Sequence, residues 1–315
     1  MPELPEVEVV RAGLEFAVTG ARVASVTVFD PRSLRRHPGP AEDFIDRLTG
    51  RSFTTALRRG KYLWLPLAAL KTKEFRADRA ETRGERLISG ETPSFSDEAL
   101  VVHLGMSGQV LLRAPTADDR LTRIRIDLEH PTHGLLRLNF VDQRIFGSMA
   151  IDELIPTPDV AGALVPKSVA HIARDPLDPH FNDAVFLSRL ARRNTGVKRA
   201  LLDQGLISGI GNIYADEALW AARIRYDQPT GSLSRRRAKL LLAEVRLVLA
   251  RALAEGGTSF DAQYVNVNGA SGYFSHSLNA YGQQGKPCPR CGRPIVRETF
   301  MNRGSHFCPH CQRLR

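Results

Sequence analysis

The first residues of the chain place an unusual nucleophile beside two carboxylates. Pro2 follows the initiator Met1, and removal of that methionine leaves a secondary amine at the new N-terminus. An α-amino group has a pKa near ~8, against about 10.4 for lysine, so more of it is unprotonated at neutral pH. Such an amine can attack an electrophilic carbon and form a Schiff base. Glu3 and Glu6 lie within one helical turn of it and are suited to move protons.

The same residues also fit an ordinary helix start. Proline is common in the first turn of a helix, and glutamate there complements the helix dipole. Residues 3–18 carry apolar side chains at spacings of three and four, which predicts one amphipathic helix. These side chains are Leu4, Val7, Val10, Leu14 and Val18. The chemistry of the proline therefore depends on what the rest of the chain places around it.

Composition indicates a partner that is a polyanion. The 315 residues contain 44 Lys and Arg against 34 Asp and Glu, which gives a net charge of +10. This bias favours nucleic acid as the partner, although a basic protein without such a partner has the same composition. There is no apolar run of about 18 residues and no signal-peptide pattern, so we expect a cytosolic protein.

The four cysteines form a metal-binding pattern near the end of the chain. Cys288, Cys291, Cys308 and Cys311 make two Cys-x-x-Cys knuckles with sixteen residues between them. Two such knuckles close a tetrahedron of thiolates around zinc, and four protein ligands leave no open position for water. We therefore expect one structural Zn²⁺, which would fold about 30 residues that are too few to hold a core alone. No organic cofactor is expected.

The predicted zinc finger, residues 286–315, is strongly basic. Its only acidic residue is Glu298, against seven cations: Lys286, Arg290, Arg293, Arg297, Arg303, Arg313 and Arg315. A small basic finger suits contacts with phosphates. Arg303 precedes the second knuckle, where a finger tip would present it, although a solvated arginine would have the same sequence context.

The pattern along the chain changes from strands to helices. Short runs rich in Val and Leu predict a β-sandwich or barrel; they are 22–29, 62–70, 99–113, 123–128 and 134–141. Residues 71–98 are highly charged and predict a mobile surface loop. Residues 151–165, with Pro156 and Pro158, predict an interdomain linker.

The second half has helical texture. The predicted helices are 184–193, 198–204, 212–222 and 234–255, and a long loop is expected over 261–278. Gly209 and Gly211 lie in a turn that opens a helix at or near Asn212. Such glycines let backbone approach a phosphate closely, and a helix N-terminus favours the anion. An ordinary turn between packed helices is the alternative.

Four motifs together resemble the bacterial formamidopyrimidine-DNA glycosylases. They are residues 2–7, residues 103–108, the turn at 209–217 and the Cys₄ finger, in the order that the family has them. The resemblance implies a multi-domain α+β fold: an N-terminal helix with a β-sandwich (1–152), a linker (153–166), a helix–two-turn–helix domain with a lesion-recognition loop (167–285) and a zinc finger (286–315). DNA would lie in the basic cleft between the halves.

The family's activity implies the roles of several residues. Pro2 would attack C1′ of a damaged deoxynucleotide, and Glu3 matches the general acid/base. Glu6 matches a second acidic position, and Lys61 matches an essential hairpin lysine. The base leaves, a Schiff base joins enzyme and sugar, and elimination cuts the strand on both sides. The enzyme would be a bifunctional glycosylase and abasic-site lyase that acts on oxidised purines such as 8-oxoguanine.

The resemblance also implies the DNA contacts. Asn212 and Arg303 match a phosphate clamp, Lys198 matches a lysine near the lesion, and His103 belongs to a DNA-contacting motif. A base must leave the stack before its C1′ can be reached, and the gap must be filled. Three further residues match the family's filling trio: Met106, Arg144 and Phe146. An apolar wedge compensates for the lost stacking, and Arg144 can donate to the opposite base, such as cytosine.

The chain departs from the family pattern in three places. One is the insertion at 71–98, which is longer than a plain family hairpin and has no assigned role. The sequence from Asp142 to Phe146 lacks the proline that often precedes the family's wedge arginine, which predicts a less rigid loop. Gly304 stands next to the finger arginine. The loop at 261–274 lies where the family closes over the damaged base, but its sequence does not predict the lesion preference.

Two other functional classes remain open from the sequence. An endonuclease VIII-type glycosylase shares the N-terminal proline but prefers oxidised pyrimidines; Leu4, Pro5 and Arg144 favour the purine enzyme. A zinc-finger DNA-binding protein or a zinc-ribbon RNA-binding protein would explain the charge, but it would not need Pro2, Glu3 and Lys61. We expect a monomer that binds damaged double-stranded DNA in the bacterial nucleoid.

Overall fold

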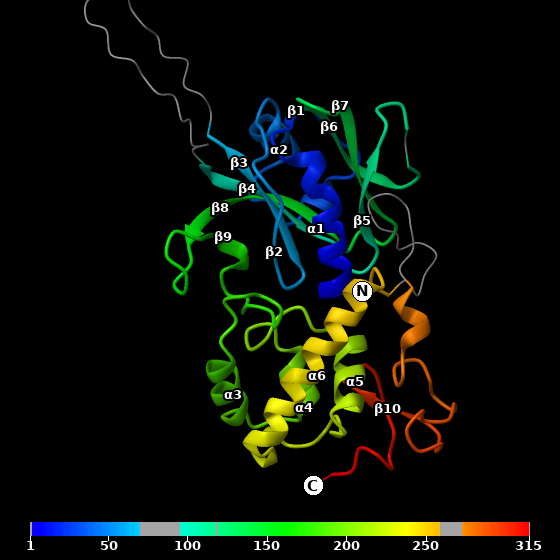
Figure 1. Ribbon diagram of the computed structural model, residues 1–315. Coiled ribbons are helices and arrows are strands. Elements are labelled where there is room, and N and C mark those ends of the chain that lie inside the picture. Colours follow the sequence, from blue (N-terminus) through cyan, green and yellow to red (C-terminus); the bar gives the residue numbers. More distant parts are fainter. Residues whose placement is uncertain (1, 70–94, 118, 259–272, 315) are drawn as a thin grey trace, which may run out of the picture.

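A computed structural model shows two halves stacked end to end, with the N-terminus at their junction (Figure 1). It describes residues 2–69, 95–117, 119–258 and 273–314. One half is built from two β-sheets and the other from helices with a small hairpin at its side. The expected multi-domain α+β class is confirmed.

Two antiparallel sheets and α1 (Leu4–Val18) form the first half. One sheet has the order β1-β6-β7-β5, and the other has the order β2-β3-β4-β8-β9. The elements are β1 (Arg22–Val28), η1 (Pro31–Leu34), α2 (Ala41–Leu48), β2 (Leu57–Arg59), β3 (Tyr62–Ala68), β4 (Phe95–His103), β5 (Gly108–Arg113), β6 (Thr122–His130), β7 (Gly134–Asp142), β8 (Ser148–Pro156) and β9 (Leu164–Pro166).

The apolar stripe of α1 packs into the core of this half. Val7, Val10 and Leu14 are each 1% exposed and join the inward-facing residues of both sheets. Strand β6 shows the alternation expected of a sheet with one buried face, since Ile124 and Ile126 are buried. The helix therefore begins at the junction of the halves and runs up along the sheets (Figure 1).

Three predictions about this half are wrong in detail. The run 99–113 is interrupted by a tight turn, because Gly105 adopts φ +64° between β4 and β5. Residues 151–165 are not a free linker: Ile155 pairs with Val165, and β8 and β9 extend the sheet. The end of the charged segment 71–98 belongs to β4, where Glu98 binds Arg47 (2.6 Å) and Arg51 (3.2 Å). Residues 70–94 lie outside the described residues.

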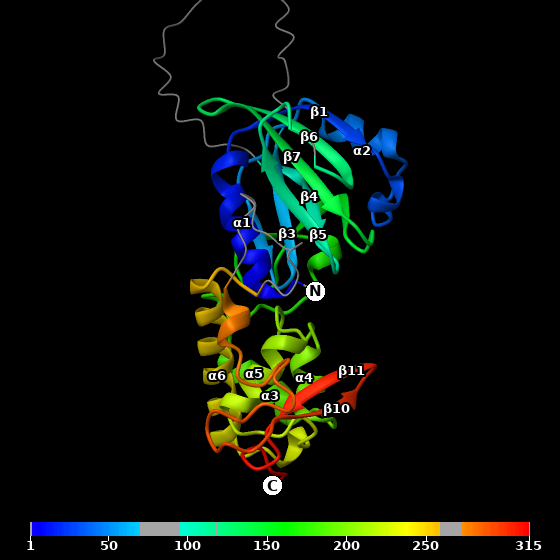
Figure 2. The same cartoon turned by 90° about the vertical axis from the view of Figure 1, so that its right-hand side faces the viewer.

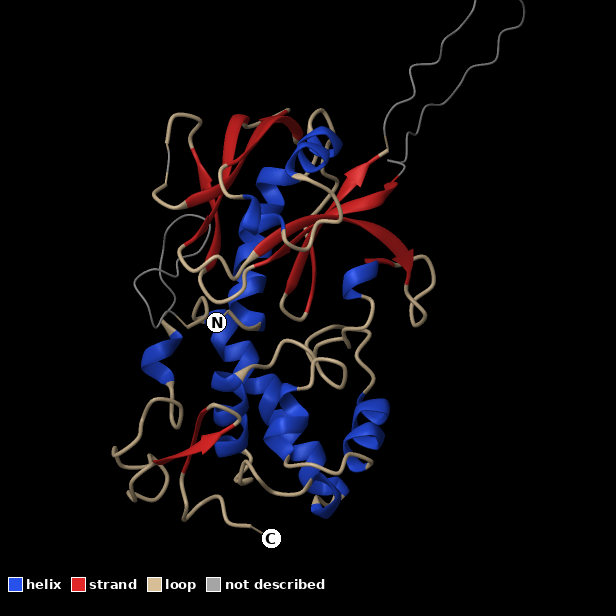
Figure 3. Ribbon diagram, turned by 180° about the vertical axis from the view of Figure 1, so that it is seen from behind, coloured by secondary structure: helices blue, strands red, loops and turns tan. Residues whose placement is uncertain are grey.

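Among the described residues, the second half contains four α-helices and a two-stranded finger; Figures 2 and 3 show how they are arranged. The helices are α3 (Asp183–Ala191), α4 (Val197–Leu202), α5 (Asn212–Ala221) and α6 (Arg235–Ala254), with one-turn elements η2 (Lys167–Val169), η3 (Thr230–Ser232) and η4 (Phe274–Ser277). The finger pairs β10 (Val296–Phe300) with β11 (Arg303–Phe307). Asn182 and Ser234 cap α3 and α6 through their side chains, as N-cap residues do.

The core of the helical half includes a buried residue from α1 and a buried residue from the finger. Leu4 of α1 is 0% exposed and packs among the helices, and Phe307 of the finger is 1% exposed in the same cluster. The start of α1 is thereby fixed against the helical half. No helix of the described ranges is long and apolar enough to cross a membrane.

Candidate active site

Glu3 lies at the junction between the two halves. It precedes α1, it is 2% exposed, and its carboxylate reaches the start of α5. There it accepts hydrogen bonds from the backbone N–H groups of Gly211 (2.5 Å) and Ile213 (3.0 Å). Burial raises the pKa of Glu3, whereas nearby Lys61 and these N–H groups lower it; the net shift is upward. A carboxyl group with a raised pKa is suited to acid/base chemistry.

The glycine turn before α5 receives this carboxylate. A Cβ atom at Gly211 would lie 2.3 Å from Cδ of Glu3, so no side chain fits there. Gly209 has φ +86°, and a Cβ atom on it would lie 2.6 Å from the side chain of Leu4. The sequence leaves two interpretations of these glycines open, a close approach to a phosphate or an ordinary turn between packed helices. In the structure, the anion at the N-terminus of α5 is the carboxylate of Glu3.

Glu6 holds the junction from the next turn of α1. One of its carboxylate oxygens accepts a hydrogen bond from the backbone N–H of Glu3 at 2.8 Å. The other accepts from the hydroxyl of Tyr214 (2.5 Å) and from the N–H of Thr258 (2.7 Å). Since both oxygens are engaged, the contacts of Glu6 are those of a group that positions Glu3. Burial and the neighbouring Glu6 raise the pKa of Tyr214 well above 10.

Pro2 and Lys61 flank Glu3 from two directions. Pro2 is buried and directly precedes it in the chain. Lys61 follows Gly60 (φ +58°) in the turn between β2 and β3, and its Nζ donates to the carbonyl of Ile210 at 2.9 Å. Burial lowers the pKa of Lys61, and the negative charge of Glu3 opposes this shift. The structure therefore brings together three residues that the sequence predicts to share one site.

Arg303 is presented at the tip of the finger. Met301 and Asn302 both have positive φ, 46° and 59°, as in a two-residue hairpin turn. Arg303 follows the turn and is exposed. It lines two adjoining clefts, one of about 580 Å³ that includes Lys61 and one of about 490 Å³ that includes Glu3.

The backbone next to Arg303 is fastened to the helices. The carbonyl of Gly304 accepts a hydrogen bond from Nδ2 of Asn212 at 3.1 Å and one from Nζ of Lys198 at 3.3 Å. Asn212 and Arg303, the predicted phosphate clamp, thus lie together at the first turn of α5. Tyr281 lines the cleft that contains Glu3, and it was not among the predicted site residues. It lies in a stretch of mixed polar residues that carries no sequence signal.

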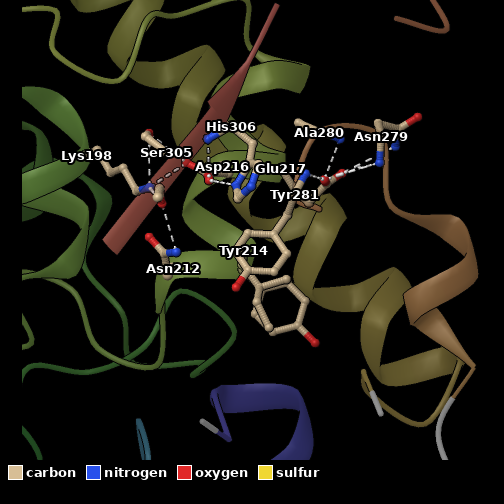
Figure 4. Close-up of polar contacts among 12 residues, drawn as sticks. Lys198, Asn212, Tyr214, Asp216, Glu217, Asn279, Ala280, Tyr281, Ser305 and His306 are labelled. Atoms are coloured by element: carbon tan, nitrogen blue, oxygen red, sulfur yellow. Dashed lines mark hydrogen bonds and ion pairs between the residues drawn. The ribbon is translucent and has the colours of Figure 1, made fainter. Parts of the chain in front are cut away.

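Lys198 occupies a different place from the one expected. It is 0% exposed, and its Nζ lies 2.6 Å from Oδ1 of Asp216. Oδ2 of Asp216 accepts a hydrogen bond from the N–H of His306 at 2.8 Å, and Ser305 donates to Oδ1 at 3.1 Å (Figure 4). In this structure the contacts of Lys198 join α4, α5 and the finger, and its DNA contact stays a prediction.

A second carboxylate on α5 fixes the chain that leads into the finger. Glu217 accepts hydrogen bonds from the backbone N–H groups of Asn279 (3.0 Å), Ala280 (2.8 Å) and Tyr281 (2.8 Å), as Figure 4 shows. Burial raises the pKa of Glu217, and these donors oppose the shift. Asp216 therefore binds the finger strand at Ser305 and His306, and Glu217 binds the chain at residues 279–281. Tyr281 and His306 both line the cleft that contains Glu3.

The predicted wedge residues are exposed on two adjoining loops. Met106 is 45% exposed between β4 and β5, and Phe146 is 49% exposed between β7 and β8. Arg144 is also exposed. Asp142 joins the loops: it accepts from the hydroxyl of Ser107 at 2.6 Å and from the N–H of Arg144 at 3.1 Å. Single exposed apolar side chains are common, but two on adjoining loops leave an apolar surface open to a partner.

The loop between β7 and β8, residues 143–147, carries Arg144 and Phe146 and is named the wedge loop. It is held by an arginine whose role the sequence did not predict. The guanidinium of Arg35 donates to the carbonyls of Ile145 (2.8 Å), Gly147 (2.9 Å) and Phe146. Ile145 has φ +56°, a strained conformation for a β-branched residue. The absence of the family's proline therefore does not leave this loop unsupported.

His103 lies at the end of β4 in the cleft that contains Lys61. Its Nδ1 accepts a hydrogen bond from the N–H of Gly105 at 3.2 Å, so Nε2 carries the proton and can donate. Burial lowers its pKa to about 4, and the positive charges of Arg36, Arg35 and Lys61 add to the shift. The imidazole is neutral at neutral pH.

The four cysteines converge as a zinc site requires. Their Sγ atoms all lie within 4.8 Å of one another, and Cys291 and Cys308 are 3.5 Å apart. A tetrahedral ion with Zn–S distances near ~2.3 Å fits among four thiolates. Nε1 of Trp220 donates to Cys288 at 3.4 Å, and this contact ties the metal site to α5.

Comparison with known proteins agrees with this geometry. Residues 1–149 match the family model of the formamidopyrimidine-DNA glycosylase N-terminal domain, 172–263 match its H2TH domain, and 285–314 match the zinc finger found in FPG and IleRS. A formamidopyrimidine-DNA glycosylase of Leifsonia xyli is 61% identical and covers 100% of both chains, and one of Thermobifida fusca is 51% identical over 99% of this chain and 97% of its own.

Solved structures of similar proteins include DNA complexes. Lactococcus lactis Fpg in complex with abasic-site DNA has a TM-score of 0.76 and 27% identity, and covers 99% of both chains. A point mutant of the same enzyme in complex with Fapy-dG DNA has a TM-score of 0.77, 28% identity and the same coverage. The chain belongs to the formamidopyrimidine-DNA glycosylase family.

Proposed function

We propose that this protein excises oxidised purines from double-stranded DNA and then cleaves the strand through a Schiff base on Pro2, once Met1 is removed. Its family makes it a DNA glycosylase of base excision repair with abasic-site lyase activity. The observation that carries the proposal is the position of Glu3. A buried carboxylate with a raised pKa directly follows Pro2 and faces a cleft that Arg303 and Met106 also line.

The chemistry begins with nucleophilic attack by the Pro2 amine. The nitrogen forms a bond to C1′ of a flipped nucleotide, the glycosidic bond breaks, and the base leaves with its electron pair and a proton. Glu3 moves that proton and assists opening of the sugar ring. The iminium that results acidifies C2′, so that loss of a C2′ proton expels the 3′ phosphate, and a second elimination expels the 5′ phosphate.

The cations of the cleft support these steps. Phosphate leaving groups and a flipped backbone carry negative charge, which Lys61 and the exposed guanidinium of Arg303 can neutralise. Asn212 presents an amide at the same wall of the cleft. His103 can donate from Nε2 to a phosphate without carrying a charge of its own.

Base flipping is assigned to the exposed loops. Met106 and Phe146 are suited to enter the stack, and Arg144 to pair with the orphaned base. The four thiolates hold one structural Zn²⁺ that keeps the finger folded. Lesion recognition is assigned to residues 261–274. Of these, residues 261–272 lie outside the part of the chain that the structure describes. We further propose that the protein acts as a monomer on DNA of the bacterial nucleoid.

Substrate choice separates this proposal from the endonuclease VIII-type alternative. One of the similar structures is a complex of Lactococcus lactis Fpg with DNA that contains an oxidised pyrimidine. The two alternatives are therefore distinguished by the ratio of cleavage rates on the two kinds of lesion. Single-turnover cleavage is measured on matched duplexes with 8-oxoguanine opposite cytosine or with an oxidised pyrimidine, with Glu3→Gln as the inactive control. We expect faster cleavage of the purine duplex. A clear preference for the pyrimidine duplex contradicts the purine assignment, and equal binding without cleavage of either contradicts an enzyme.

A further inference from the structure

Arg59 is a buried cation that has no partner among the described residues. It is the last residue of β2 and is 7% exposed. Its neighbour Arg58 points the other way and pairs with Glu8 (2.8 Å) and Asp175 (2.9 Å). The backbone of Arg59 pairs with Tyr62 in the hairpin, but its guanidinium makes no hydrogen bond or ion pair with any residue that the structure describes. Burial lowers the pKa of Arg59, and the positive charge of Arg174 adds to this shift, whereas the nearby carboxylates of Asp159, Asp178 and Asp175 oppose it.

A largely buried arginine without a directly bonded carboxylate is unfavourable for folding unless its guanidinium reaches solvent or an anion. Arginine keeps its charge in proteins, so it cannot avoid the desolvation penalty by losing a proton. The usual solution is a carboxylate partner, as Arg58 has on the same strand. Arg59 instead lines an open cleft of about 530 Å³, where an anion from outside the chain can reach it.

The Arg59 cleft is rich in cationic and imidazole side chains. Besides Arg59 it is lined by His171, Arg174, His180 and Arg189. Arg174 is already neutralised, because its guanidinium lies 2.6 Å from Asp159 and 2.7 Å from Asp178.

Two cations of the cleft are left without a carboxylate. Arg59 and Arg189 have no ion pair within the described parts of the chain, and Arg189 is exposed on α3. Two free guanidinium groups facing one cleft are suited to bind the oxygens of a phosphate.

The cleft is continuous with the active site. The neighbouring cleft that contains Lys61 and Arg303 shares His171, Ile172 and Gly205 with it. Arg59 and Lys61 are separated only by Gly60, at most ~7 Å of chain. A Cβ atom at Gly60 would lie 2.7 Å from Cβ of Ser208, so the turn that carries both cations is pressed against the helical half.

We infer that the Arg59 cleft is a second anion site, which binds a backbone phosphate of the lesion-bearing strand outside the active site. This inference rests on the proposed function, because it takes DNA as the ligand. The strand held at Lys61 and Arg303 continues past His171, and its next accessible phosphate meets the guanidinium of Arg59. The contact replaces the carboxylate that Arg59 lacks and fixes the strand beside the reacting sugar.

The test uses the full-length, zinc-loaded protein and duplexes with a tetrahydrofuran abasic-site analogue. Neutral methylphosphonate linkages replace the phosphates of the lesion strand one at a time, and affinity is measured for the wild type, Arg59→Gln and the control Arg236→Gln. Arg236 is an exposed arginine of α6. We expect the wild type and the control to lose affinity on the order of tenfold at one flanking linkage. Arg59→Gln should not respond to that linkage, and its salt slope should fall by about one.

Two further measurements decide the remaining cases. The DNA-free Arg59→Gln protein should unfold at the same or a higher temperature than the wild type; a clear loss of stability assigns Arg59 a structural role and overturns the site. Inorganic phosphate is then added to both proteins. If it raises the unfolding temperature of the wild type but not of Arg59→Gln, and the linkage scan is the same for both proteins, the cleft binds a free anion and the DNA contact is overturned. Borohydride trapping of the wild type on lesion DNA tests the proposed function separately: failure to trap overturns that function, whereas a linkage scan that is the same for wild type and Arg59→Gln overturns only the Arg59 site.

Discussion

The carboxylate of Glu3 lies 2.5 Å from the backbone nitrogen of Gly211, a residue 208 positions further along the chain. This contact joins the β-rich half to the helical half at the point where the proposed nucleophile begins the chain. It also explains why the turn contains glycine, since any Cβ atom at position 211 would overlap the carboxylate.

Gly211→Ala should abolish most excision without unfolding the protein. The φ of Gly211 is −124°, which alanine tolerates, but the new Cβ would lie 2.3 Å from Cδ of Glu3. A misplacement of that size lowers the rate by about 100-fold or more. Single-turnover excision of 8-oxoguanine measures the effect. Gly231→Ala is the matched control, because nothing lies within 4 Å of its Cβ position. Equal rates for the two variants would show that the placement of Glu3 is unimportant.

Arg35→Ala should weaken binding to abasic-site DNA. The variant frees three carbonyls of the wedge loop and lets Ile145 leave its strained conformation, so Phe146 is no longer held for insertion. Because Arg35 is exposed, the stability loss should be only about 1 kcal/mol. Arg35→Lys keeps the charge but loses the planar fork, and it should behave like alanine. Full activity of the lysine variant would mean that charge alone, and not the hydrogen bonds, supports the loop.

Acidification should destabilise the protein in part through His103. Its pKa is about 4 in the folded state against an ordinary value of 6.5, so the unfolded chain binds more protons between these values. Stability therefore rises with pH from about 4 to 6.5 and is lost as pH falls through that window. Thermal unfolding against pH should show a shallower slope for His103→Gln than for the wild type. Parallel curves for the two proteins would contradict a buried, neutral histidine.

Asp216→Asn should loosen the finger. The variant removes the carboxylate that pairs with fully buried Lys198 at 2.6 Å, and leaving a buried charge unpaired costs about 3–5 kcal/mol. The free energy of unfolding measures this loss, and the Kd for abasic-site DNA reports the position of Arg303. Adding Lys198→Met to Asp216→Asn should recover part of the stability, since both charges are then gone. A double variant that is less stable than Asp216→Asn alone would contradict the ion pair as the cause.

The sequence predicts what is local and misses what is assembled from distant segments. The stripe of Leu4, Val7 and Val10 predicts α1, and the spacing of the cysteines predicts the metal site. No local pattern shows that Glu3 would occupy the N-terminus of α5, because that contact joins residues more than two hundred positions apart. For this reason the local pattern of the glycine turn leaves a phosphate site and an ordinary turn equally open, and it does not indicate the carboxylate that the structure has there.

Arginine and lysine roles are the hardest to predict. The sequence indicates no role for Arg35 or Arg59, and it places Lys198 near the lesion only through the family resemblance. In the structure one supports the wedge loop, one is buried without a partner among the described residues, and one is buried against Asp216. Their burial and partners follow from tertiary packing, which composition and spacing do not encode. Strands β8 and β9 escape prediction because two prolines make their segment resemble a linker.

Covalent trapping tests the central claim most directly. The zinc-loaded protein without Met1 is incubated with duplex DNA that contains 8-oxoguanine opposite cytosine and is reduced with borohydride, and the adduct is mapped by peptide mass. We expect a covalent protein–DNA adduct on Pro2, which is lost in Pro2→Gly and in protein that retains Met1. An adduct on a lysine, or no adduct from protein that still binds the duplex, would contradict it.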